Sequence, residues 1–257
     1  MDEERHQRLW RTIAERAEGS GSTGWAGAVC AAVVSLVDGV DAATLTVRAN
    51  SRAQETWGAS DEWAASLEEL QYTLGEGPGL DAFRTGNVVL APYLGSEEAR
   101  WPAFVQAVSS LGLGAAVAFP LQVGAIRLGT LDLFCRTSGR LTPEALADAA
   151  VLADLSVYAL LRQLGDSPAE GPSGVPDPAE EPELAEGPGP APNAGDLPLS
   201  YHEVHLATGM LAAHLEVELD EAFARLRARA YSEDRPLLAL ARDIVARRVS
   251  LDDDDST

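Results

Sequence analysis

The spacing of apolar and polar residues divides this chain into four segments. From residue 1 to 165, stretches with apolar residues at helical spacing are interrupted by short runs with the alternation of strands. Residues 166–198 have few apolar side chains. Helical spacing returns in 199–251, and residues 252–257 are polar. We therefore expect an α+β domain, a linker, an all-helical module and a short tail, in that order.

The first segment alternates helix and strand signals. The expected helices are 6–17, 25–36, 61–70, 102–111 and 143–164, and the expected strands are 42–49, 54–57, 88–90, 115–123 and 128–134. Ser60 is the expected N-cap of the third helix and Thr142 that of the last, where Pro143 takes the first helical position. This order predicts an α+β fold, an antiparallel sheet flanked by helices.

The segment 199–251 predicts three short helices. Ser200 and Glu203 have the spacing of a capping box at the start of the first helix, which should run to Leu215. The second should cover 220–232, and Pro236 should open the third. Because about fifty residues make only a small hydrophobic core, we expect support from a second copy of the chain.

The segment 166–198 is the expected linker. It holds nine prolines and eight acidic residues, and no basic residue. Few apolar groups and charges of one sign leave little to offset the entropy of ordering, so an extended or disordered segment is expected. We therefore expect the domains on either side to move independently of each other.

The net charge of −21 is unevenly distributed. The linker contributes −8 and the tail Asp252–Asp255 contributes −4, so the helical module itself is close to neutral. All 19 basic residues are arginine. The absence of lysine excludes a Walker A phosphate loop and a protein kinase, which both need a lysine, and the lysine of a response-regulator receiver domain is missing as well.

The cysteines and the N-terminus point to a cytoplasmic protein. Cys30 and Cys135 are far apart in sequence and form neither a disulfide framework nor a zinc-site spacing. The acidic N-terminus lacks the apolar stretch of a signal peptide. The apolar run 25–37 is too short to span a bilayer, so no contact with a membrane is expected.

The segment 1–165 resembles a GAF domain over nearly its whole length. The resemblance is carried by 74–79 (Leu-Gly-Glu-Gly-Pro-Gly), 119–121 (Phe-Pro-Leu) and 128–134 (Leu-Gly-Thr-Leu-Asp-Leu-Phe). Glycines at 75, 77 and 79 allow a tight loop with exposed backbone N–H groups, which could cover a pocket over the sheet. The candidate sensor pocket consists of Trp57, Leu74, Gly75, Glu76, Gly77, Pro78, Phe119, Leu121, Thr130, Asp132 and Phe134.

The resemblance implies a sensor for an unknown small-molecule or protein signal. The cofactor stays unknown, because the sequence carries no cyclic-nucleotide, haem or bilin signature. Some GAF domains reduce methionine sulfoxide with cysteines, so a reductase that uses Cys135 is one alternative. No Ser-His-Asp set, carboxylate pair or metal cluster stands out, so we expect no enzyme.

The C-terminal segment resembles an ANTAR module, through Ala207, Gly209, Leu226, Arg227 and Ala230. The resemblance implies binding to RNA hairpins in nascent transcripts, commonly as a homodimer, and transcription antitermination. The candidate RNA-binding residues are Thr208, Gly209, Arg225, Arg227, Arg229, Arg242, Arg247 and Arg248. Thr208 departs from the family, because many members have a basic residue there, and its absence removes a phosphate contact.

Together these features predict a signal-responsive antiterminator in which the GAF-like domain controls the ANTAR-like module. Arginines can clamp phosphates and stack on looped-out bases, but ion pairs of the same side chains with Glu221 and Asp243 are the alternative. A DNA-binding regulator that uses the three helices as a helix-turn-helix and a scaffold for protein interactions are further alternatives.

Overall fold

The computed structural model describes residues 9, 11–13, 24–49, 54–165, 201–233 and 235–249. Its elements before residue 166 are α2 (Gly24–Leu36), β1 (Ala42–Arg48), β2 (Gln54–Ala59), α3 (Glu62–Leu74), α4 (Pro78–Thr85), β3 (Val89–Ala91), η1 (Leu94–Ser96), α5 (Pro102–Val108), η2 (Ser109–Leu111), β4 (Ala115–Val123), β5 (Ile126–Cys135) and α6 (Pro143–Gly165). Of the helix expected at 6–17, only the helical residues 9 and 11–13 are described. The expected linker and tail lie outside the described residues.

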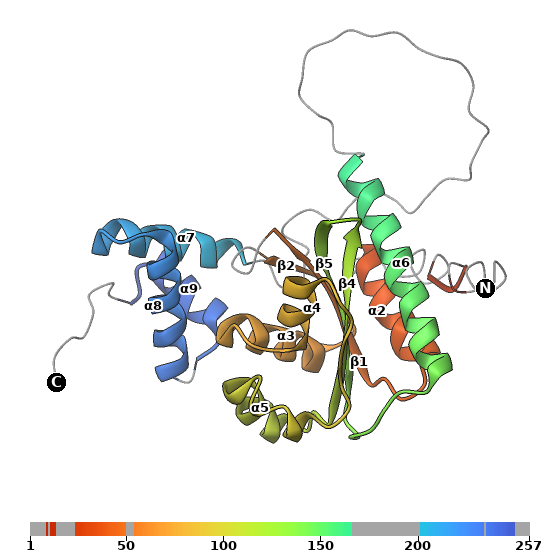
Figure 1. Ribbon diagram of the computed structural model, residues 1–257. Coiled ribbons are helices and arrows are strands. Elements are labelled where there is room, and N and C mark those ends of the chain that lie inside the picture. The colour runs from red at the N-terminus through yellow and green to blue at the C-terminus, as the bar shows by residue number, and fades with distance from the viewer. Residues whose placement is uncertain are drawn as a thin grey trace, which may run out of the picture.

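A five-stranded antiparallel sheet organises the α+β domain, as the sequence predicts. Its strand order is β2-β1-β5-β4-β3. Helices α2 and α6 cover one face, and α3, α4 and α5 lie on the other (Figure 1). No helix within the described ranges is long and apolar enough to cross a membrane.

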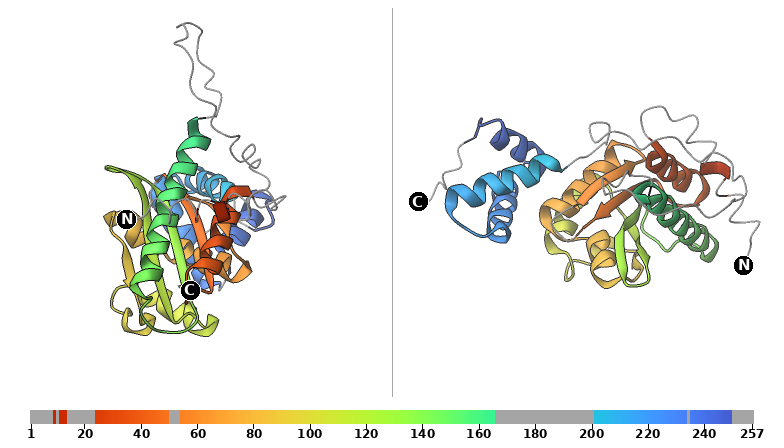
Figure 2. Two further views of the ribbon diagram at one scale, coloured as in Figure 1. Left: turned by 90° about the vertical axis from the view of Figure 1, so that its right-hand side faces the viewer. Right: turned by 90° about the horizontal axis from the view of Figure 1, so that it is seen from above.

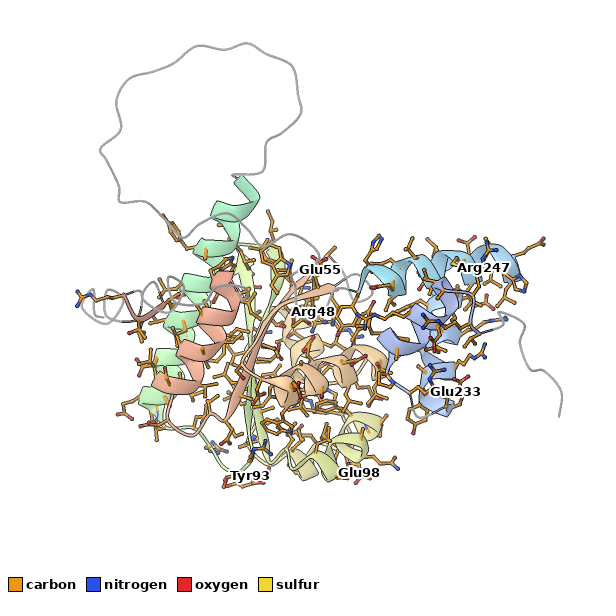
Figure 3. The ribbon with its side chains drawn as sticks, turned by 180° about the vertical axis from the view of Figure 1, so that it is seen from behind. Arg48, Glu55, Tyr93, Glu98, Glu233 and Arg247 are labelled. Atoms are coloured by element: carbon orange, nitrogen blue, oxygen red, sulfur yellow. The ribbon has the colours of Figure 1, made fainter. Side chains whose placement is uncertain are left out.

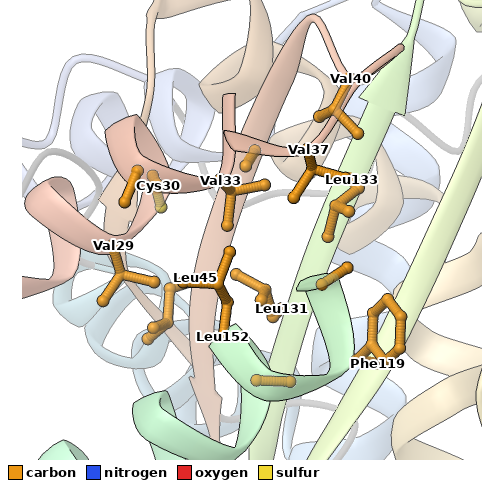
Figure 4. Close-up of a cluster of buried hydrophobic side chains, with 14 of the residues drawn as sticks. Val29, Cys30, Val33, Val37, Val40, Leu45, Phe119, Leu131, Leu133 and Leu152 are labelled. Carbon is orange, nitrogen blue, oxygen red and sulfur yellow. The ribbon is translucent and has the colours of Figure 1, made fainter. Parts of the chain in front are cut away.

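The face under α2 and α6 holds the larger apolar core. Side chains at odd positions of β1 and β5, such as Leu45 and Leu131, point to this face and pack with Val33 of α2 and Leu152 of α6 (Figure 4). All four are fully buried. Such burial of an aliphatic side chain stabilises a fold by roughly 1.5–3 kcal/mol, so this layer supplies much of the stability of the domain.

Two local features differ from the sequence-based expectation. Asp61, not Ser60, caps α3, because its carboxylate accepts a hydrogen bond from the Ala64 backbone N–H at 2.8 Å. The Ser60 hydroxyl instead accepts from the Ala43 backbone N–H in the neighbouring strand. Helix α4 was not expected, since its glycine-rich start has the composition of a loop.

Three helices form the C-terminal module: α7 (His202–Leu215), α8 (Leu219–Ser232) and α9 (Leu237–Val245). They pack around a small apolar core that includes Val204, Leu226, Leu240 and Ile244, as their helical spacing predicts. Ser200 of the expected capping box lies outside the described residues, and Tyr201 stands at the N-cap position of α7.

The α+β domain and the C-terminal module, which the sequence predicts to move independently, are in contact in this structure. Helix α3 packs against α8 and α9 (Figures 1 and 2). The composition of a linker determines how far a tethered domain can reach, but it says nothing about the fit of the two surfaces.

Candidate functional site

Polar residues gather on the sheet face under α3, where an apolar core would be the ordinary arrangement. Even-numbered positions of β1 and β5 point to this face, and the strand register places Thr44 opposite Asp132 and Thr46 opposite Thr130. The set of buried polar residues, called here the polar cluster, consists of Thr44, Thr46, Arg48, Gln54, Thr56, Glu68, Gln71, Thr130 and Asp132.

A buried ion pair lies at the centre of the polar cluster. The Arg48 guanidinium donates to Glu68 Oε1 from Nη2 at 2.6 Å, and both side chains are fully buried. Arg48 is labelled in Figure 3. Arg48 also donates to Gln54 Oε1, and Gln71 donates to Glu68 Oε2 at 2.8 Å. Removing one partner of such a pair leaves a buried charge uncompensated, so these residues depend on each other.

The polar cluster has one cation and two carboxyl groups. Burial and repulsion by Glu68 raise the pKa of Asp132 to about 7, although Arg48 and Thr130 act in the opposite direction. Burial also raises the pKa of Glu68. The Thr130 hydroxyl donates to Asp132 Oδ2 at 2.7 Å, whereas Oδ1 of Asp132 has no hydrogen-bond partner within the described part of the chain. Unpaired buried polar atoms are costly, and they often mark a place where a ligand or water binds.

The loop 74–79 joins α3 to α4 above this cluster. Gly75 ends α3 with a φ of 67°, and Gly77 precedes α4 with a φ of 135°, so both need the left-handed freedom of glycine. The Gly79 N–H donates to the Gln71 amide oxygen at 2.8 Å, and a Cβ on Gly79 would lie 2.3 Å from Asp132 Oδ1. The first turn of α4 therefore closes directly over Asp132.

Glu76 and Pro78 stabilise the starts of two helices. The Glu76 carboxylate accepts from the backbone N–H groups of Ala103 and Phe104, at 3.0 and 3.2 Å, and so caps the start of α5. Pro78 takes the first position of α4.

The structure does not bring all predicted pocket residues together. Thr130, Asp132 and Phe134 share the face under α3, α4 and α5, where Leu74 packs against the apolar cluster that contains Phe134. Trp57, Phe119 and Leu121 pack on the opposite face, in the core under α2 and α6. The predicted residues therefore do not form one pocket, because alternate positions of a strand face opposite sides of the sheet.

Both cysteines are buried thiols. Cys30 is fully buried and Cys135 is 3% exposed. Burial raises the pKa of Cys30 to about 12 and that of Cys135 to about 11. A thiol needs its deprotonated form for nucleophilic or redox chemistry, so neither environment activates the sulfur. Among the described residues, no group of three or more His, Cys, Asp and Glu side chains could hold a metal ion.

The predicted RNA-binding arginines divide into outward and inward side chains. Arg225 and Arg229 lie one turn apart on α8 and form ion pairs with Glu221 at 2.6 Å and Glu233 at 2.7 Å. Arg227, between them, is turned toward the α+β domain, where its Nε donates to the Thr73 carbonyl oxygen at 2.6 Å.

Three further arginines lie on α9 or just after it. Arg242 is 3.5 Å from Glu203 of α7, and Arg248 is 3.1 Å from Asp243. Arg247 is exposed in a left-handed conformation with a φ of 55°, at the far side of the module from Arg48 (Figure 3).

Thr208 and Gly209 lie in the middle of α7. Thr208 is buried, and its hydroxyl donates to the Val204 carbonyl oxygen of its own helix at 2.7 Å. Gly209 is half-buried, and a Cβ there would meet no atom within 4 Å. Among the residues that the structure describes, no neighbouring group therefore requires a glycine at this position.

Sequence reasoning missed the charged centre of the polar cluster, namely Arg48, Gln54, Glu68 and Gln71. A signal was present, because Thr44, Thr46 and Arg48 occupy alternate positions of one strand and Glu68 and Gln71 are three residues apart on one helix. That pattern is also typical of a solvent-exposed face, and only the packing of α3 on the sheet buries it.

Several solved structures are similar to this chain at low sequence identity. They include the GAF domain of a phosphoenolpyruvate-protein phosphotransferase from Acinetobacter, with 9% identity, 66% of this chain and 100% of that chain covered and a TM-score of 0.48. The phycocyanobilin-bound GAF domain of a cyanobacterial phytochrome has 11% identity, with 65% and 100% covered and a TM-score of 0.46. The type II free methionine-R-sulfoxide reductase of Thermoplasma acidophilum has 14% identity, with 58% of this chain and 96% of that chain covered and a TM-score of 0.40.

Among curated proteins, none matches this chain. Comparison with protein families gives a match for the C-terminal helices: residues 200–245 match the family model of the ANTAR domain.

Proposed function

We propose that this protein is a signal-responsive RNA-binding regulator that acts by transcription antitermination. The observation that carries the proposal is the match of residues 200–245, which include all of α7, α8 and α9, to the ANTAR domain, an RNA-binding antiterminator family. The α+β domain supplies the input and the helical module supplies the output.

The outward arginines support an RNA contact. Arg225 and Arg229 pair with Glu221 and Glu233. Arg242 and Arg248 likewise form ion pairs at the surface, with Glu203 of α7 and with Asp243. Exposed ion pairs of this type contribute only about 0–1 kcal/mol, so they can be exchanged for RNA phosphates. The guanidinium can bind a phosphate through two hydrogen bonds and can stack on an unpaired base.

The polar cluster supports a signal-binding role for the α+β domain. It places an arginine, two carboxyl groups and unpaired polar atoms such as Asp132 Oδ1 beneath a glycine-rich loop. Protein interiors seldom hold so many polar groups without a functional reason. A small polar molecule suits these hydrogen-bonding groups best.

The experiment that tests RNA binding begins with crosslinking and sequencing of the RNA that the full chain contacts in cells. The recovered RNA, carrying two hairpins, is then compared with duplex DNA of similar length in equilibrium binding at one salt concentration. We expect binding of RNA over DNA, with two chains per RNA. Equal binding of both, or no recovered RNA, would contradict the proposal and favour the DNA-binding or scaffold alternatives.

Single substitutions locate the contact. Arg225→Ala and Arg229→Ala should each weaken RNA binding. Each should also lower the number of counterions released on binding, measured from the salt dependence of the affinity, by about one. Arg140→Ala is the matched control, because Arg140 is an exposed arginine of the α+β domain. If the control weakens binding as much as the two α8 variants do, the contact lies elsewhere on the chain.

A further inference from the structure

An aromatic contact joins the output module to α3. Tyr72 of α3 packs against Tyr201, at the start of α7, with ring centroids 4.4 Å apart, and against Phe223 of α8 at 5.6 Å. Tyr72 and Tyr201 are 1% and 0% exposed. Tyr72 belongs to the buried core of the C-terminal module, although its own helix belongs to the other domain.

Two helix ends are also capped across this contact. Arg227 of α8 donates to the Thr73 carbonyl oxygen in the last turn of α3, the end that carries the negative pole of the helix dipole. A Cβ on Gly75 would lie 2.1 Å from Arg227 Nη2, so this glycine leaves room for the guanidinium.

In the second cap, a side chain of α3 binds the start of α9. Leu238 lies in the first turn of α9, whose N-cap Pro236 offers no side-chain acceptor. The Glu69 carboxylate of α3 accepts from the Leu238 N–H at 3.3 Å. Each domain thus satisfies backbone groups at a helix end of the other, which non-specific contact between two surfaces would not produce.

Tyr201 connects this contact with the polar cluster. Its ring packs on Tyr72, which follows Glu68 by one turn on α3, and its buried hydroxyl lies within electrostatic reach of Glu68 and Glu69. Glu68 in turn pairs with Arg48. Any rearrangement of the ion pair would therefore change the surroundings of the Tyr201 side chain.

The interface is incompletely packed elsewhere. A pocket of about 310 Å³ that is open to solvent lies between α3 and the α8–α9 junction, with Leu70 and Thr73 on one side and Ala230, Tyr231 and Pro236 on the other. Open pockets of this kind are common where two separable domains meet.

We propose that the contact of Tyr72, Glu69 and Thr73 with the output module is an autoinhibitory latch. In the docked state α3 occupies Arg227 and the start of α9, and RNA has no access to them. A signal that rearranges the polar cluster moves Tyr201 and releases the module. This inference rests on the proposed RNA-binding function and adds its regulation.

The test uses variants of α3, because α3 is not part of the RNA-binding module. Tyr72→Ala removes both ring contacts, while Tyr72→Phe keeps the ring. The side chain packs with the module and not with either core of the α+β domain, so Tyr72→Ala should leave that domain folded. Glu62→Gln, at the exposed first turn of the same helix, is the matched control.

Two measurements on the full chain decide the result. In Tyr72→Ala, hydrogen exchange at the Leu238 amide should accelerate about tenfold or more, because its acceptor on α3 moves away. The affinity for the two-hairpin RNA recovered by crosslinking should rise by about tenfold. Tyr72→Phe and Glu62→Gln should stay within about threefold of the wild-type chain in both measurements.

The outcomes separate the latch from the proposed function. Faster exchange at Leu238 with unchanged RNA affinity overturns the latch and leaves the RNA-binding function intact. Unchanged exchange in Tyr72→Ala shows that the contact does not hold the module, and it also overturns the latch. Failure of both the wild type and Tyr72→Ala to bind the RNA overturns the proposed function, and the latch with it.

Discussion

Replacing Asp132 with asparagine should make the α+β domain more stable at neutral pH and leave it nearly unchanged at acid pH. Asp132 is fully buried, and the single cation of the polar cluster, Arg48, is already paired with Glu68. A second buried carboxylate therefore lacks a counter-charge, and its protonated form is favoured. Asparagine has almost the same shape as the protonated acid and cannot ionise.

The size of this stability difference follows from the pKa of Asp132. An ordinary aspartate has a pKa of 3.8, and the fold raises that of Asp132 to about 7. Below about pH 4 the group is protonated in both the folded and unfolded states and does not affect stability. Between pH 4 and 7 only the unfolded chain releases the proton, so the folded state loses stability as pH rises. A pKa difference of about 3 corresponds to a loss of about 4 kcal/mol, reached above pH 7.

Urea unfolding followed by tryptophan fluorescence measures this effect, because all five tryptophans lie before residue 166. The free energy of unfolding of the wild type should fall relative to that of Asp132→Asn by about 4 kcal/mol between pH 4 and pH 8. Asp154→Asn, at an exposed site of α6, should show no such trend. Parallel pH profiles for the wild type and Asp132→Asn would refute the reasoning from burial and repulsion.

Two glycines give opposite predictions. In Gly79→Ala the new Cβ would lie 2.3 Å from Asp132 Oδ1, so the α+β domain should lose about 1–3 kcal/mol in urea unfolding, while the exposed Gly95→Ala, whose Cβ meets nothing, should change little. Equal losses in both would rule out the close approach of α4 to Asp132. Gly209→Ala should stabilise the helical module by about 1 kcal/mol in circular-dichroism melts, since a Cβ there has open space. If RNA packs against the backbone at this point, Gly209→Ala also weakens RNA binding; unchanged affinity would remove Gly209 from the candidate interface.

Much of the fold could be predicted from the sequence because its periodicity is strong. The alternation in 115–123 and 128–134 gave the central hairpin, and Thr142 with Pro143 marked the start of α6, where the Thr142 hydroxyl accepts from the Ala145 N–H. Helix α4 could not be predicted in this way, because Gly77, Pro78 and Gly79 read as a loop while tertiary contacts with Gln71 and Asp132 hold them.

The candidate pocket shows a different limit of sequence reasoning. Phe119 and Asp132 both lie on central strands, but the register pairs Asp132 with Ala118, so Phe119 points to the opposite face. Alternation gives two faces for each strand, and only the register between strands decides which faces coincide.

The contacts between the two domains could not be predicted from the sequence. Arg227 matched the ANTAR pattern, yet its guanidinium binds the Thr73 carbonyl of another domain. Neither charge nor helical spacing distinguishes an arginine that binds RNA from one that caps a distant helix, because both tasks use the same donors.

The most direct test of the account is the affinity of the full chain for its two-hairpin RNA, measured with and without the Tyr72 ring. If the C-terminal helices bind RNA and α3 holds them back, Tyr72→Ala binds the RNA about tenfold more tightly than the wild type. Equal affinity of the two chains, together with a normally folded variant, would contradict the account.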